Sequence, residues 1–304
     1  MPGDSHIQWT DATWNPTTGC TRVSAGCDHC YAFQLHDQRH AAWTAGTWPD
    51  APAQYRRPFA EVQLIPDRLA VPLRWTKPRR IFVDSMSDLF HADVPDDFIV
   101  DVFAAMAVAD RHVFQVLTKR PQRLHRLLAA EGFRERVDLA MRPLIRAHGT
   151  RQAKWDLSRA ESHWTPVLRT WPLPNVWLGV SVERDDVAHR IDWLAKTPAA
   201  VRFLSCEPLI GPLILTPERL VGIGWVIVGG ESGPGARPMG TGWAHHLVFA
   251  CQRAGVAVFV KQLGSVLAGQ VGLPSKGGDM DAWPSSLDDL KVREFPAATI
   301  GAGE

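Results

Sequence analysis

Residues 81–117, IFVDSMSDLFHADVPDDFIVDVFAAMAVADRHVFQVL, contain one complete repeat of the architecture that we expect for most of the chain. Residues 81–84 and 113–117 are short, nearly continuous apolar runs, which are typical of strands covered on both faces. Between them, residues 95–109 start with proline and two acidic residues and then repeat apolar residues at helical spacing. This order predicts a right-handed β-α-β unit with parallel strands.

Similar apolar runs recur along the chain, and helical patterns separate many of them. Further strands are predicted at 6–14, 176–182, 201–205, 225–228 and 256–260, and further helices at 121–130 and 243–254. We therefore expect an α/β fold with a partial or complete parallel (β/α) barrel. Residues 1–264 would form this domain with insertions near 41–58 and 133–173, and residues 265–304 would be a tail that wraps the surface.

Polar or charged residues follow six of the predicted strands, at 84–88, 118–120, 181–183, 205–207, 229–232 and 261–262. In parallel α/β barrels the carboxyl ends of the strands converge on one mouth, which carries the chemistry. Helix capping alone also places polar residues at such positions. The six strand ends taken together favour a functional site at the mouth.

The composition limits the class of protein. The chain has 304 residues, of which 45% are hydrophobic and 21% charged, and this balance is typical of globular proteins. A net charge of +1 gives no global field that would draw the protein to nucleic acid or to an anionic membrane. The N-terminus lacks the pattern of a signal peptide, and no apolar stretch approaches the roughly 20 residues of a membrane helix. We therefore predict a cytoplasmic protein without membrane contact.

Residues 111–159 are an exception to the balanced charge, because they contain twelve Lys and Arg residues against four Asp and Glu residues. Such a stretch could face the phosphates of DNA or RNA. It could equally be a solvated helical face that uses arginine, and the sequence leaves both interpretations open.

Three of the five cysteines lie in the segment GCTRVSAGCDHCY (19–31), which follows the first predicted strand. An odd number of cysteines, clustered in this way, indicates metal ligation rather than a secreted disulfide framework. Cys20, Cys27 and Cys30 could bind three irons of a cubane cluster and leave the fourth iron open. Zinc is the alternative, with His29, His36 or His40 as a fourth ligand, but the spacing between the Cys and His pairs is too short for a zinc finger.

A three-cysteine loop after the first strand of a parallel barrel resembles the radical S-adenosylmethionine superfamily. More narrowly, the chain is similar to a family of phage and bacterial proteins of uncertain function. The similar stretches are WTDATWNPTTGC (9–20), GCDHCY (26–31), IFVDSMSDLFH (81–91), FQVLTKRP (114–121), VWLGVSVE (176–183), RFLSCEPL (202–209) and VIVGGESGPGARP (226–238). They extend through nearly the whole chain.

The resemblance implies a [4Fe-4S] cluster on Cys20, Cys27 and Cys30, with S-adenosylmethionine bound to the open iron. One electron from an external reductant would cleave the cofactor to a 5′-deoxyadenosyl radical, which takes a hydrogen atom from the substrate. The chain departs from the superfamily in two places. Six residues rather than three separate the first two cysteines, and residues 85–88 stand where the superfamily commonly has Gly-Gly-Glu.

Eight polar residues near the predicted mouth are candidates for cofactor binding: His29, Ser85, Ser87, Asp88, Lys119, Arg120, Ser181 and Glu183. His29 would lie near the adenine, and residues 85–88 would hold the amino or ribose groups. Ser181 and Glu183 would bind ribose hydroxyls or the methionyl group, and Lys119 and Arg120 would pair with its carboxylate or with a substrate phosphate. Helix capping and ordinary ion pairs are the alternative roles of these residues.

Cys206 is a candidate catalytic residue because it ends the fifth predicted strand. A thiol that points into the barrel mouth could donate a hydrogen atom to a substrate radical, as in spore photoproduct lyase, a DNA-repair member of the superfamily. The alternative is a small buried core residue, which is the common role of a free cysteine. Cys251, in an apolar helix, is expected in the core.

Three functions are therefore open. The first is a radical S-adenosylmethionine enzyme that repairs or modifies DNA, RNA or a nucleotide. The second is an enzyme of the same class with a peptide or small-molecule substrate. The third is a zinc-stabilised nucleic-acid-binding protein of phage origin without catalysis. The oligomeric state is not predicted.

Overall fold

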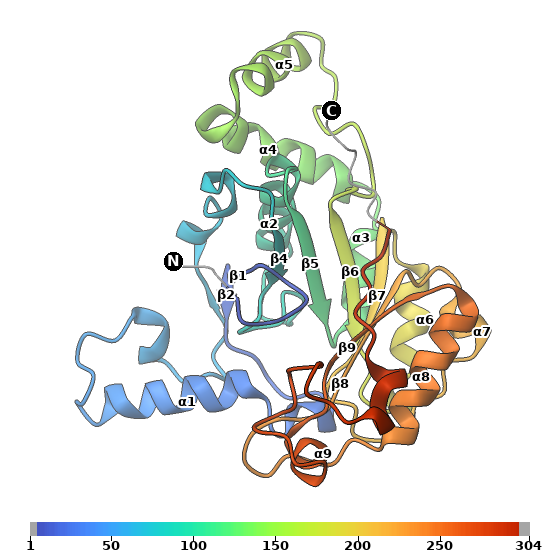
Figure 1. The fold of residues 1–304 in the computed structure, drawn as a ribbon. Helices are drawn as coiled ribbons and strands as arrows, with labels where there is room; N and C mark the ends of the chain where they lie inside the picture. The colour runs from blue at the N-terminus through green and yellow to red at the C-terminus, as the bar shows by residue number, and fades with distance from the viewer. Residues whose placement is uncertain (1–4, 298–304) are drawn as a thin grey trace.

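The fold is built on a seven-stranded sheet whose neighbouring strands are all parallel (Figure 1). The computed structural model describes residues 5–297. The sheet has the order β1 (Ala12–Trp14), β4 (Arg80–Val83), β5 (Val113–Thr118), β6 (Val176–Ser181), β7 (Val201–Cys206), β8 (Trp225–Gly229) and β9 (Ala257–Gln262). Because each new strand is added beside the one before it, the sheet grows in a single direction, as in a barrel.

The sheet is curled into a half-barrel that helices flank (Figure 1). Successive strands are connected through α2 (Asp96–Val108), α3 (Pro121–Leu128), α6 (His189–Lys196) and α8 (Thr241–Ala254). The predicted α/β class with a partial parallel barrel is therefore confirmed, as are all seven strands. The strand expected from residue 6 begins only at Ala12, because residues 7–10 form a turn in which Thr10 N donates to Ile7 O (3.1 Å).

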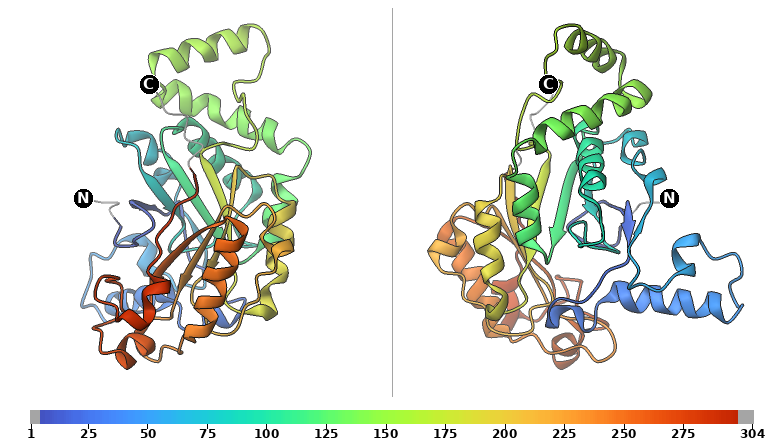
Figure 2. Two further views of the ribbon diagram at one scale, coloured as in Figure 1. Left: turned by 45° about the vertical axis from the view of Figure 1, so that its right-hand side comes forward. Right: turned by 180° about the vertical axis from the view of Figure 1, so that it is seen from behind.

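The two predicted insertions are partly helical. Residues 41–58 continue α1 (Tyr31–Thr44) and then form a 3-10 helix at Ala53–Arg56, and this arm extends to one side of the barrel (Figure 2). Residues 133–173 contain α4 (Phe133–His148) and α5 (Arg151–Ser162). The remaining elements are β2 (Thr17–Thr18) and β3 (Gln63–Leu64), which pair antiparallel, α7 (Pro217–Leu220), α9 (Ser265–Gln270) and short 3-10 helices at Ala25–Cys27, Pro66–Arg68, Pro72–Arg74, Asp185–Val187 and Ser285–Leu290.

The segment after β9 packs along the free edge of the sheet. Arg293 forms an antiparallel bridge with Phe259 of β9, and the indole of Trp225 donates to the carbonyl of Glu294 (2.9 Å). Trp283 and Leu290 are buried, so this segment adds to the core as well as wrapping the surface. The last part of the predicted tail, 298–304, lies outside the described residues. Within residues 5–297, no helix is both long and apolar enough to cross a membrane.

The two faces of the sheet bury different side chains, because successive residues of a strand point to opposite faces. On β8, Val226 and Val228 belong to the large cluster under the helices, whereas Trp225 and Ile227 join an aromatic cluster inside the half-barrel. Phe203 fills the same interior and needs a glycine opposite, since a Cβ at Gly179 would come within 2.4 Å of its ring.

Candidate functional site

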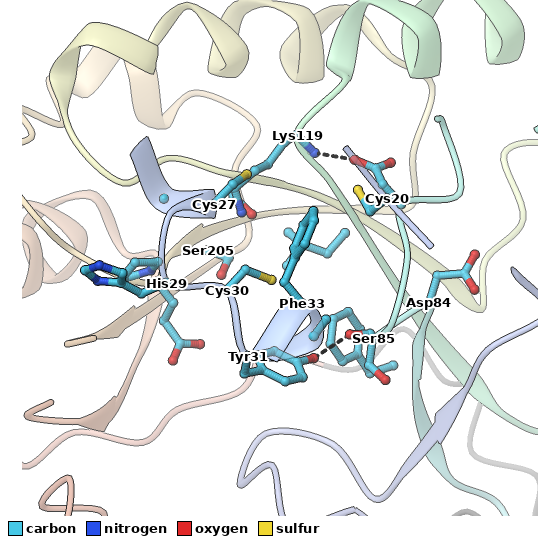
Figure 3. Close-up of a pocket in the computed structure, with 18 of the residues that line it drawn as sticks. Cys20, Cys27, His29, Cys30, Tyr31, Phe33, Asp84, Ser85, Lys119 and Ser205 are labelled. Atoms are coloured by element: carbon cyan, nitrogen blue, oxygen red, sulfur yellow. Dashed lines mark hydrogen bonds between the residues drawn. The ribbon is translucent and has the colours of Figure 1, made fainter. Parts of the chain in front are cut away.

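A cavity of about 430 Å³ opens at the carboxyl ends of the strands (Figure 3). Its size lies in the range of small-molecule sites. Cys20, Cys27 and Cys30 all line it, together with residues from the ends of β4, β5, β6, β7 and β9. The aromatic cluster fills part of the half-barrel, and its members Trp9 and Phe82 also border the cavity. The cavity therefore lies at the carboxyl ends of the strands, where the sequence predicts the mouth of the barrel.

The cysteine loop, residues 20–30, connects β2 to α1. Cys27 is buried at the end of a 3-10 turn, and Cys30 is the residue before the first turn of α1. All three cysteines are free, and Figure 3 shows their side chains on different sides of one space. Burial, assisted by the charge of Asp88, raises the pKa of the Cys20 thiol to about 11 in spite of the neighbouring Arg120 guanidinium. The cavity thus contains three reduced thiols from one short loop.

Glu183, just after β6, holds the middle of the cysteine loop. Its carboxylate accepts a hydrogen bond from the hydroxyl of Ser24, and its other oxygen accepts from Arg190 Nη1 at 2.8 Å. The side chains of Glu183 and Arg190 are only 1% and 5% exposed. The loop fits closely here, since a Cβ on Gly26 would lie 2.4 Å from the Glu183 oxygen. Glu183 itself does not line the cavity, so the structure gives it a supporting contact instead of the predicted cofactor contact.

Asp88 and Arg120 hold the beginning of the loop. The carboxylate of Asp88 accepts from the hydroxyl of Thr118 (2.7 Å), the backbone N–H of Lys119 (3.0 Å) and Arg120 Nη1 (2.9 Å). The same guanidinium donates to the carbonyl of Thr21 (3.0 Å) and lies 3.6 Å from the Cys20 sulfur. Asp88 therefore orients the cation that touches the first cysteine.

Glu231 and Arg237 hold the end of the loop from the Gly-rich segment after β8. Arg237 donates its backbone N–H (2.8 Å) and Nε (2.9 Å) to Glu231, and its Nη2 donates to the carbonyl of Ala25 (2.9 Å). His29 Nδ1 lies 2.9 Å from the same carboxylate. Burial alone raises the pKa of Glu231, but hydrogen bonds from Arg237 and His29 and the Arg237 charge outweigh it and lower that pKa to about 2.

Seven of the eight predicted cofactor-binding residues line the cavity: His29, Ser85, Ser87, Asp88, Lys119, Arg120 and Ser181. Several of them already have partners within the protein. Ser85 donates to the side chain of Asn15 (3.1 Å), and Ser87 donates to the carbonyl of Gly19 (2.8 Å). These two serines therefore attach the chain before the cysteine loop to the end of β4. Lys119 and Ser181 have no such side-chain partner among the described residues.

Asp84, the first residue after β4, was not singled out from the sequence. It has a left-handed backbone with φ of 57°, which is uncommon for a residue other than glycine. One carboxyl oxygen accepts from the backbone N–H of Thr17 (3.1 Å), whereas the other is buried without a hydrogen-bond partner. Burial raises the pKa of this carboxyl to about 8 in spite of the Thr17 hydrogen bonds. Asp84 is therefore held largely uncharged at neutral pH.

The expectation that Cys206 faces the mouth is wrong. Its side chain is fully buried in the large cluster between the sheet and the helices, near Cys251. Its neighbour Ser205 lines the cavity in its place. The reason is the alternation of β7, which points residues 205 and 207 inward and residue 206 outward. Burial raises the pKa of the Cys206 thiol well above its ordinary value, as for a core residue. Cys251 is buried in α8, as expected.

The Arg-rich stretch lies away from the cavity. Figure 1 shows α4 and α5 at the end of the sheet opposite the cysteine loop, and no residue of 133–173 lines the cavity. Two arginines of α4 form ion pairs within residues 133–173, Arg142 with Asp138 (3.0 Å) and Arg146 with Glu161. Of the twelve basic residues of 111–159, Lys119 and Arg120 alone line the cavity.

A comparison with known protein families matches residues 4–289 to the family described as "Protein of unknown function (DUF5131)". No curated protein and no solved structure matches the chain. The match covers nearly the whole half-barrel, the cysteine loop and all three carboxylates that hold it. The chain therefore belongs to this family of proteins of unknown function.

Proposed function

We propose that the protein is a radical S-adenosylmethionine enzyme in which Cys20, Cys27 and Cys30 bind a [4Fe-4S] cluster. One observation carries the proposal: three free thiols of one short loop line a single cavity at the carboxyl ends of a parallel half-barrel. Thiolates are the usual protein ligands of such clusters. Three ligands leave one iron of the cluster for the amino and carboxylate groups of S-adenosylmethionine.

The partners of the nearby histidines argue against a single zinc ion on the cysteine loop. A zinc ion needs four ligands that all touch one point, yet no three His, Cys, Asp or Glu side chains within residues 5–297 are grouped closely enough to hold one ion. The histidines that could complete a zinc site are used elsewhere. His29 contacts Glu231 (2.9 Å), while His36 and His40 contact the backbone carbonyls of residues 57 and 55 at 2.9 and 2.8 Å.

When bound, the cluster and cofactor would supply a 5′-deoxyadenosyl radical that abstracts hydrogen from a substrate. The chain's own residues then have three tasks. The three buried carboxylates fix the cysteine loop, so that its thiols stay at the cavity wall. Lys119 has free N–H donors for the methionyl carboxylate, and Ser181 and Ser205 offer hydroxyls at neighbouring strand ends. The aromatic cluster below excludes water from the reacting atoms.

The substrate is a separate question. The Arg-rich helices α4 and α5 lie at the other end of the sheet, so phosphates bound there would not reach the cavity (Figure 1). The basic charge of α4 and α5 therefore does not support DNA or RNA as the substrate at this site. An external one-electron reductant remains part of the proposal, since the cavity residues themselves offer no electron donor of low potential.

The test of the cluster is an iron and acid-labile sulfide assay after anaerobic purification. We expect about four irons and four sulfides per chain for the wild type. Cys30→Ala should lose most of this iron. Cys206→Ala is the matched control, because it removes a buried thiol outside the cavity and should retain the iron. A colourless wild-type protein, or equal iron loss in both variants, would overturn the assignment.

A further inference from the structure

A second group of charged residues lies at the cavity wall formed by β9 and the segment that follows it. Lys261 near the end of β9, Lys276 in the following segment and Glu207 after β7 all line the cavity. None of them contacts the cysteine loop through a hydrogen bond or ion pair of the described residues. These three residues therefore line the same cavity as the cysteines without holding the cysteine loop in place.

Lys261 is held in place by Glu207. Its ammonium lies 2.9 Å from one carboxylate oxygen of Glu207, and the other oxygen accepts from the indole N–H of Trp9 at 3.4 Å. Gly229 makes room for this carboxylate, since a Cβ there would come within 2.7 Å of it. An ammonium group has three N–H donors, so Lys261 keeps two for another acceptor. Its side chain is only 15% exposed, which limits the water that can serve as that acceptor.

Lys276 is attached to the same wall through its backbone. Its carbonyl accepts from the N–H of Gly264 (3.0 Å), and two residues later the carbonyl of Gly278 accepts from the side chain of Gln8 (3.0 Å). Its half-buried ammonium forms no ion pair within residues 5–297. Burial, together with the positive charge of Lys261, lowers the pKa of Lys276 in spite of the negative charge of Glu207. Lys261 and Lys276 thus line one cavity with a single carboxylate, Glu207, beside them, and a negative ligand would balance the second ammonium group.

Two cationic side chains of the cavity have no ion-pair partner among the described residues. Asp88, Glu207 and Glu231 are each paired with a cation, and Asp84 is largely uncharged at neutral pH. Lys119 and Lys276 remain as surplus cations among the described lining residues. We propose that Lys261 and Lys276 together bind an oxyanion of the substrate, a phosphate or a carboxylate group, and that the substrate is therefore an anionic compound. This inference rests on the proposed function, which makes the cavity the place of reaction.

The test is calorimetric titration of the full chain with two probes, inorganic pyrophosphate and citrate, at low salt. Wild-type protein should bind at least one of them, and the preferred probe tells a phosphate site from a carboxylate site. Lys276→Gln and Lys261→Gln should each weaken this binding about tenfold or more, as expected for a lost charged hydrogen bond. Lys291→Gln is the matched control, because Lys291 lies in the same segment, pairs with Asp288 and is outside the cavity.

Three outcomes would overturn the inference: no binding of either probe at millimolar concentration, equal binding by the Lys276 and Lys291 variants, or a Lys276 variant that loses S-adenosylmethionine but keeps the probes. The titrations are repeated on iron-free protein, because oxyanion binding by the lysines does not require iron. If anaerobically purified wild-type protein contains no iron but binds the oxyanion probes, the proposed function is refuted and this binding site still stands. Iron loading with cofactor binding but no oxyanion binding would refute only this inference.

Discussion

The carboxylate of Glu183 accepts a hydrogen bond from the hydroxyl of Ser24, although 159 residues separate the two along the chain. This contact joins the end of β6 to the middle of the cysteine loop. Asp88 through Arg120, and Glu231 through Arg237, make equivalent connections from β5 and β8. The loop that carries the thiols is thus fixed to three strand ends by buried charges. Positioning of this kind is what a site built on a loop requires.

Glu183→Gln should destabilise the protein by about 3–5 kcal/mol, because it leaves the buried Arg190 guanidinium without its counter-charge. Urea unfolding measures this change. The matched control is Arg136→Gln, which breaks an ion pair whose side chains are 42% and 94% exposed and should cost at most about 1 kcal/mol. Similar losses of unfolding free energy in the two variants would show that the ion pair of Glu183 does not contribute the predicted stability.

Gly26→Ala should displace the cysteine loop, since the new Cβ would stand 2.4 Å from the carboxylate of Glu183. We expect a loss of about 1–3 kcal/mol from overpacking, together with reduced iron content. Gly242→Ala provides the comparison, because nothing lies within 4 Å of a Cβ there and the first turn of α8 should gain stability. Normal iron loading in Gly26→Ala would contradict the close fit between loop and strand.

Asp84→Asn should stabilise the protein at pH 7–8 relative to the wild type. The folded-state pKa of Asp84 is about 8, whereas an unfolded aspartate titrates near pH 4. A raised folded pKa contributes stability that is present below about pH 4 and is lost as pH rises toward 8. The stability advantage of Asp84→Asn should therefore grow across this pH interval in thermal unfolding. An advantage that stays constant from pH 4 to pH 8 would show that the carboxyl is ionised throughout.

Cys206→Ala should cost about 1 kcal/mol of stability and leave iron content unchanged, because the thiol is a core group. In native wild-type protein, iodoacetamide should label neither Cys206 nor Cys251, since both are fully buried and their thiol pKa values are raised by burial. Mass spectrometry of the labelled protein reports this directly. Rapid native labelling of Cys206 would restore the hypothesis that it opens to the mouth.

The sequence was informative wherever local periodicity determines structure. All seven strands and the helices after β4, β5 and β8 follow from apolar spacing and start signals, and the polar strand ends do converge on one cavity. The prediction that Cys206 faces the mouth of the barrel failed because residues 205 and 206 are both polar and both lie at the end of the strand. Only the register of β7 decides which of the two side chains points inward.

The contacts that hold the cysteine loop could not be read from the sequence. Glu183 and Arg237 are separated from the loop by more than 150 residues, and nothing in their neighbourhoods marks them as the partners of Ser24 and Ala25. The Gly-Gly-Glu at 229–231 was visible but had no assigned role, and it proves to supply Glu231 to this support. Lys276 lies in a Gly- and Pro-rich segment expected only to wrap the surface, so its place at the cavity is a product of tertiary packing.

Electron paramagnetic resonance of the anaerobically reduced protein, recorded with and without S-adenosylmethionine, tests the central claim most directly. The account predicts the signal of a reduced [4Fe-4S] cluster and a change in that signal when the cofactor is added, because the cofactor would bind the iron that no cysteine holds. We expect Cys206→Ala to show the same change in the signal, because the Cys206 thiol does not touch the site. A protein that contains zinc and no iron, or a cluster signal that the cofactor leaves unchanged, would contradict the account.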